Sequence, residues 1–176
     1  MNSEFPSLRC TRGWDTVRGA LATQLRRSDF RICHISVQRT HLHLLVEADH
    51  AKALASGMGG FQIALAKRIH SWLGTRGEVF SDRYFATPLR TPAQVRNALA
   101  YILCNWRKHG EDRAERSLAA MDPFSSAGSL EAWREFRTQA EAQRGGCPVA
   151  TPQFWGLAIG WTRHGPISCL ARPLHR

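Results

Sequence analysis

The 176-residue sequence lacks the patterns that mark membrane and secreted proteins. It contains no run of about 18 apolar residues, which argues against a transmembrane helix, and residues 1–6 show no signal peptide. Its five cysteines form no C-x-x-C pair, and their odd number argues against a complete disulfide framework. We therefore expect a soluble protein of the reducing cytoplasm, without a membrane partner.

Acidic residues and lysine are also scarce. Lysine and arginine together number 24 against 14 aspartates and glutamates, a formal net charge of +10, and nearly all the basic residues are arginine. The sequence pI is about 10.4. Such an excess favours phosphate backbones through counterion release, so it supports a nucleic-acid partner without specifying one.

Residues 41–47 alternate as a half-buried β-strand does. One face carries Leu42, Leu44 and Val46, and the other carries His41, His43, Leu45 and Glu47. Residues two apart on one face have Cα atoms roughly 6 to 7 Å apart, so both imidazoles can reach one cation. The alternative is two polar side chains on a solvated face, and the spacing by itself does not separate the two.

A helix is predicted from Thr91-Pro92 onward, with threonine as N-cap and proline at the first helical position. Its apolar stripe is Val95, Leu99, Ile102, Leu103 and Trp106. At about 100° per residue, Tyr101, Asn105 and Lys108 share a sector roughly 60° wide beside that stripe. A phenol, an amide and an ammonium group are therefore expected on one flank.

Three segments taken together resemble the HUH transposases with a single catalytic tyrosine, in particular the REP-associated tyrosine transposases. They are residues 41–47, residues 77–84 (Gly-Glu-Val-Phe-Ser-Asp-Arg-Tyr) and residues 101–105 (Tyr-Ile-Leu-Cys-Asn). The resemblance runs from about Pro6 to His109, and weakly into residues 160–165. Each motif is modest alone, but their order and spacing are specific.

The resemblance implies a site and a reaction. His41, His43 and the amide oxygen of Asn105 would hold Mg²⁺ or Mn²⁺, and Tyr101 would be the nucleophile. The implied activity is a single-stranded DNA endonuclease and strand-transferase of DNA transposition and recombination, acting through a 5′-phosphotyrosine at hairpin-forming sites. Tyr84, the only other tyrosine, is the alternative nucleophile, although packing or stacking suits it better.

Four basic residues are candidate contacts to the DNA backbone: Arg39, Arg83, Arg107 and Lys108. The expected partner is single-stranded or hairpin DNA, bound by a monomer or a homodimer that is nucleoid-associated when on DNA. Many surface arginines are merely solvated, so these assignments rest on proximity to the motifs.

The expected fold is α+β, a ferredoxin-like layer of mainly antiparallel sheet with helices packed on it. The predicted elements are a helix through Trp14, Val17, Leu21 and Leu25, a strand at 30–37, the histidine strand, a helical region from Ala51 interrupted by Gly57, Gly59 and Gly60, a strand at 79–89, the Tyr101 helix and a short helix at 130–144. Residues 1–110 would form the catalytic domain and residues 111–176 a linker and partly helical tail. Trp155 and Trp161 in that tail are predicted to be packing anchors rather than base-stacking platforms.

The family's first strand precedes the first helix and pairs beside the histidine strand, but residues 1–10 do not read as a strand. We therefore expect that strand to be missing and the chain to be truncated at its N-terminus, which would weaken stability and activity. Two other readings stay open: a catalytically inactive, truncated or domesticated hairpin-binding module, and an RNA-binding α+β domain whose His-x-His is accidental.

Overall fold

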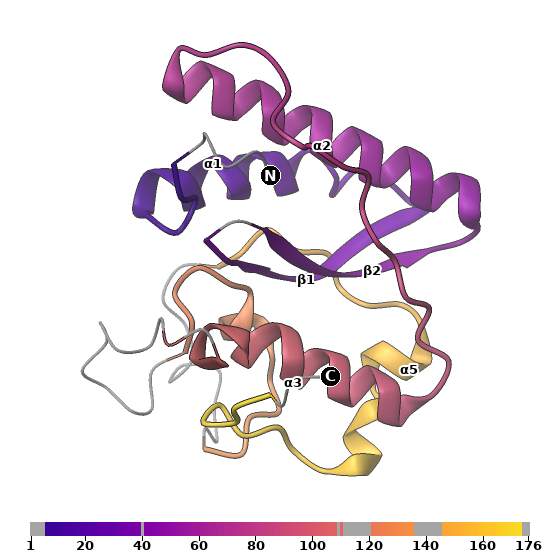
Figure 1. Ribbon diagram of the computed structural model, residues 1–176. Helices are drawn as coiled ribbons and strands as arrows, with labels where there is room; N and C mark the ends of the chain where they lie inside the picture. Colours follow the sequence, from indigo (N-terminus) through magenta and orange to yellow (C-terminus); the bar gives the residue numbers. More distant parts are fainter. Residues whose placement is uncertain (1–5, 40, 109, 111–120, 136–145, 174–176) are drawn as a thin grey trace.

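The computed structural model describes residues 6–39, 41–108, 110, 121–135 and 146–173. Within them the chain folds as three layers (Figure 1). Helices α1 (Thr11–Ala22) and α2 (Ala51–Leu73) cover one face of an antiparallel pair of strands, β1 (Phe30–Val37) and β2 (Leu42–Ala48), and α3 (Pro92–Lys108) covers the other face. The predicted α+β class, with helices packed on an antiparallel sheet, is confirmed.

The hairpin runs from the pair Phe30 and Ala48 to the pair Val37 and Leu42, with a bulge at Cys33. The strand predicted at 30–37 is confirmed with those bounds. The outer edge of β1 is covered by the tail, because the Val37 N–H donates to the Phe124 carbonyl at 2.9 Å. Contacts of this kind fix β1 in the interior of the fold.

The outer edge of β2 borders a groove of about 710 Å³, whose other wall is formed by residues 80–89. The strand predicted at 79–89 is wrong, because the structure has neither helix nor strand over these residues. A strand needs a hydrogen-bonded neighbour, and here the groove separates the segment from β2. The described residues place no strand between the two.

Helix α2 is continuous, so the predicted interruption at its glycines is wrong. Gly57 is buried under the ring of Phe30, where a Cβ atom would lie 2.1 Å from the ring Cγ. The glycine thus allows α2 to approach β1 closely, and this contact outweighs the weak helix propensity of glycine.

Helix α1 ends at Ala22, one turn earlier than predicted, and leaves Leu25 47% exposed.

Helix α3 begins with reciprocal capping bonds. The Gln94 N–H donates to Thr91 Oγ1 at 3.2 Å, and the Thr91 N–H donates to Gln94 Oε1 at 3.2 Å. This capping box satisfies backbone donors that the first turn leaves unpaired. It confirms the predicted helix start and determines which side of α3 carries Tyr101.

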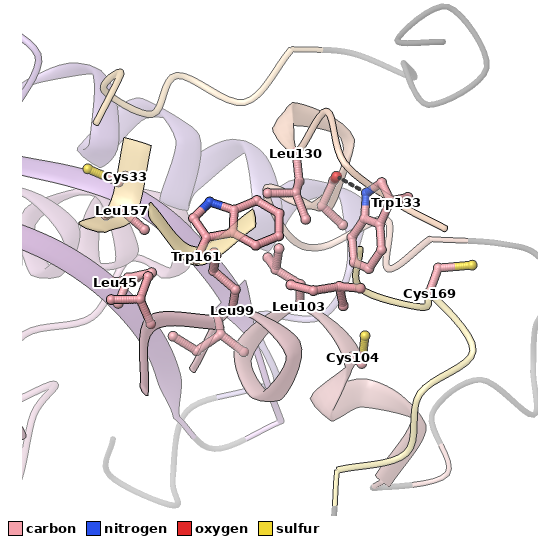
Figure 2. Packing of buried hydrophobic residues seen from close by; sticks show 14 residues of the cluster. Cys33, Leu45, Leu99, Leu103, Cys104, Leu130, Trp133, Leu157, Trp161 and Cys169 are labelled. Carbon is pink, nitrogen blue, oxygen red and sulfur yellow. Dashed lines mark hydrogen bonds between the residues drawn. The ribbon is translucent and has the colours of Figure 1, made fainter. Parts of the chain in front are cut away.

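The tail packs on α3 and completes the hydrophobic cluster below the sheet (Figure 2). Trp161 is 4% exposed, and Trp133 Nε1 donates to the Ala127 carbonyl at 2.9 Å. The tail contains short helices, η2 (Ala127–Ser129), α5 (Trp155–Ala158) and η3 (Gly160–His164). Residues 130–135 of the helix predicted at 130–144 are not helical, and 136–144 lie outside the described residues. Residues 6–110 and the tail therefore share one core.

None of the helices in the described part of the chain is long and apolar enough to cross a membrane.

Candidate metal and tyrosine site

The two histidines of the β2 segment meet at their Nε2 atoms. His41 Nε2 lies 3.0 Å from His43 Nε2, and the ring centroids are 4.6 Å apart. Two nitrogens that bind one ion at about 2.1 Å with a right angle between them are separated by about 3.0 Å. The same geometry serves a hydrogen bond between neutral imidazoles, so the pair fits a cation site without requiring one.

Tyr101 packs against this pair from α3. The ring centroids of His43 and Tyr101 are 5.2 Å apart, and the rings meet edge to face at 77°. The contact arises because Leu45, on the same face of β2 as His43, is buried against Val95 and Leu99 of α3. The hydrophobic contact thus brings the Tyr101 ring against the His43 imidazole.

Asn105 follows Tyr101 by one helical turn and is completely buried. Its Oδ1 and Nδ2 atoms have no hydrogen-bond partner among the described residues. A buried polar group of this kind costs about 1–3 kcal/mol, so it calls for a functional explanation. An amide oxygen together with two imidazoles would be a suitable donor set for a divalent cation.

The described residues contain no group of three or more histidine, cysteine, aspartate or glutamate side chains that could hold a metal ion. A site on the histidine pair therefore needs a ligand of another type, and Asn105 is the candidate by its burial and its lack of a partner. The predicted trio of His41, His43 and Asn105 would supply three protein ligands and would leave positions for water and phosphate oxygens.

Lys108 lies over the nucleophile candidate, with Nζ 5.2 Å from the centroid of the Tyr101 ring. The two residues are seven apart on α3 and share its flank, as the helical spacing predicts. The ammonium group is half-buried, and it places a positive charge where a phosphate or a phenolate would carry a negative one.

The other predicted DNA contacts are placed differently. Arg107 is 3% exposed and its Nε donates to the Cys169 carbonyl at 2.8 Å, which argues against the predicted contact with DNA. Arg39 and Arg83 are exposed, and Arg83 lines the groove beside β2.

Tyr84 also lines the groove and packs against the core under α1 and α2, in line with its predicted packing role.

Glu47, near the end of β2 away from His43, anchors the tail to this strand, a role that the sequence analysis missed. Its Oε1 accepts the Phe154 N–H at 3.0 Å, and its Oε2 accepts the Gln153 N–H at 2.9 Å and Arg31 Nε at 3.0 Å. The carboxylate therefore fixes the tail to the histidine face of β2. No local pattern could reveal this, because Gln153 and Phe154 are more than 100 residues from Glu47 in the sequence.

Cysteine chemistry does not contribute to this site. Burial raises the pKa of the Cys33 and Cys104 thiols to about 12, so both remain protonated at neutral pH. The thiolate is the reactive form of cysteine, and neither residue is a nucleophile under these conditions. Tyr101 is left as the nucleophile candidate on the α3 flank.

Comparison with protein-family models, with curated proteins and with solved structures finds no match to this chain. Its function is therefore argued from the residues and their arrangement.

Proposed function

We propose that the chain is a metal-dependent, single-stranded DNA endonuclease and strand-transferase of the HUH single-tyrosine type, with Tyr101 as its nucleophile. The observation that carries the proposal is the contact of the histidine pair with a tyrosine from a distant part of the chain. Two imidazole nitrogens lie 3.0 Å apart, and the Tyr101 ring lies against one of them. Asn105, one helical turn along α3 from Tyr101 and with no hydrogen-bond partner for its amide among the described residues, is the proposed third ligand.

His41, His43 and Asn105 would hold Mg²⁺ or Mn²⁺, since imidazole and amide donors leave room for phosphate oxygens. A divalent cation bound there would polarise the phosphodiester and offset the charge that develops on its oxygens. A phenol with a pKa near 10 is a weak nucleophile at neutral pH, so such help is needed.

The reaction needs no ATP, because one phosphoester replaces another. Tyr101 Oη forms a bond to phosphorus and gives up its proton, while the bond from phosphorus to the 3′ oxygen breaks and that oxygen takes up a proton. The products are a 5′-phosphotyrosine and a free 3′-hydroxyl. Attack by another 3′-hydroxyl reverses the step and joins a new strand. Lys108, over the Tyr101 ring, would attract the incoming phosphate.

The test is incubation of the protein with labelled single-stranded hairpin oligonucleotides and Mn²⁺, followed by a denaturing gel. A covalent protein–DNA band is expected from the wild type and from Tyr84→Phe, and none from Tyr101→Phe. Tyr84 is the matched control because it is the other tyrosine of the chain. A band that survives in Tyr101→Phe would overturn the assignment of the nucleophile.

A second candidate is a hairpin-binding module that does not cut. Within the described residues, β2 is hydrogen-bonded to a strand on one edge only, and a groove of about 710 Å³ lies along its other edge. This one-sided support of the histidine strand favours a module that binds without cutting. Hairpin binding without any adduct in Mn²⁺ would select this reading over the nuclease.

A further inference from the structure

Large apolar side chains are exposed where the tail meets β2. Phe154 is 58% exposed, Trp155 is 47% exposed and Ile159 is 58% exposed, while Phe85 on the facing segment is 94% exposed. Phe85 and Phe154 both line the groove beside β2, whose lining also includes His41 and His43. The aromatic surface is thus continuous with the proposed metal site.

The position of Phe154 is set by Glu47, which accepts its backbone N–H. Glu47 and His43 lie on the same face of β2, four residues apart. Four residues of an antiparallel strand span about 13 Å. The backbone at Phe154 therefore lies at the end of β2 away from the histidine pair, within reach of a few nucleotides of one strand.

Both rings are held by close glycine contacts. A Cβ atom on Gly156 would lie 2.7 Å from Cε1 of Phe154, and one on Gly160 would lie 2.7 Å from Cζ3 of Trp155. Neither position has room for a side chain while the rings stay in place. The rings are therefore pre-positioned, which lowers the entropy lost when a ligand binds them.

Positive charge accompanies the rings. The Arg163 guanidinium lies 4.9 Å from the centroid of the Trp155 ring, and Arg83 is exposed along the groove. The whole chain has a net charge of +10. Exposed aromatic rings beside arginines in a basic protein complement a strand that has free bases and a charged backbone.

We infer that Phe154 and Trp155, with Arg163, form a stacking platform for unpaired bases of the DNA strand whose phosphate is held at the histidine pair. The inference rests on the proposed function for the nature of that strand. Phe154 offers a ring to a base at the groove, and Arg163, supported by Trp155, offers its charge to the adjacent phosphate. The sequence-based prediction that Trp155 is a packing anchor is thereby replaced, whereas Trp161 is buried as predicted.

The test measures binding of a labelled single-stranded oligonucleotide by fluorescence anisotropy in EDTA, where cleavage cannot occur. Phe154→Ala and Trp155→Ala are each expected to weaken binding about tenfold, in the range found for loss of one stacked base. Phe154→Leu should weaken it as much, because leucine keeps the apolar surface but cannot stack. The matched control is Ile63→Ala, since Ile63 is 59% exposed on α2 and does not line the groove.

An oligonucleotide with abasic sites should bind the wild type more weakly than the intact oligonucleotide does. It should bind the wild type and Phe154→Ala with equal affinity. Wild-type affinity in Phe154→Leu together with loss in Phe154→Ala would overturn the platform and indicate an apolar contact, such as a peptide strand added to β2. Equal binding by all variants, or no binding by the wild type, would also overturn it. Failure of the nuclease proposal is separate, since it would appear as a missing covalent adduct in Mn²⁺.

Discussion

His41 Nε2 lies 3.0 Å from His43 Nε2, and this contact is the structural centre of the proposed site. His43 lies on β2 and His41 immediately precedes the strand, yet nothing in their spacing obliges the rings to converge. The convergence coincides with the packing of Tyr101 on His43, which brings α3 against that face. The site is thus assembled where a strand and a helix share one hydrophobic contact.

Mn²⁺ is expected to raise the melting temperature of the wild type and not that of His41→Ala. A ligand that binds only the folded state stabilises it by mass action, by about 2.7 kcal/mol at a hundred times its dissociation constant. Differential scanning fluorimetry across a Mn²⁺ series measures the shift. His70→Ala is the control, because His70 lies in the last turn of α2 and does not line the groove that His41 and His43 line. Equal shifts in His41→Ala and the wild type would refute the ligand assignment.

Asn105→Leu should raise the stability of the metal-free protein by about 1–2 kcal/mol and abolish the response to Mn²⁺. Leucine has the branched shape and the number of side-chain heavy atoms of asparagine but carries no polar atoms, so the cost of the unpaired amide disappears. Urea unfolding in EDTA measures the first effect, and thermal shifts in Mn²⁺ measure the second. A destabilised variant would mean that the amide is satisfied within the protein.

Gly57→Ala and Gly59→Ala are expected to change stability in opposite directions. A Cβ atom on Gly57 meets the Phe30 ring at 2.1 Å, and the overpacking should cost about 1–3 kcal/mol. A Cβ atom on Gly59 meets nothing within 4 Å, so helix propensity should stabilise that variant by about 0.5–1 kcal/mol. Chemical denaturation of the pair checks both signs. Stabilisation by both substitutions would contradict the close contact of α2 with β1.

Acid should destabilise the protein partly through His34. Burial lowers the pKa of His34 to about 4, whereas the unfolded chain titrates near 6.5. Between these values the unfolded state binds a proton that the folded state does not, so stability falls as pH falls from 6.5 to 4. The contribution is up to about 3 kcal/mol.

The measurement for His34 is urea unfolding of the wild type and His34→Gln at several pH values. The variant should lose less stability than the wild type across this window. Asp122 titrates in both proteins, and burial raises its pKa, so its effect cancels in the comparison. Parallel curves for the two proteins would contradict a buried neutral His34.

Local elements were largely predictable from the sequence, because they depend on periodicity and end signals carried by adjacent residues. The bounds of β1, the capped start of α3 and the shared flank of Tyr101 and Lys108 are examples. The predictions that failed depended on distant partners. The glycines of α2 form a helix because Phe30 fills the space at Gly57, and residues 79–89 form no strand because a groove separates them from β2.

The sequence by itself determined that His41 and His43 share a strand face, and that Tyr101 and Asn105 are one turn apart on a helix. Only the tertiary structure decided that the two imidazoles meet and that Tyr101 packs against His43. It also decided that the Asn105 amide is buried without a hydrogen-bond partner among the described residues and that Arg107 faces inward. It also placed Phe154 on the histidine side through Glu47. These relations join segments separated by about 60 to 110 residues, and local periodicity carries no information on such distances.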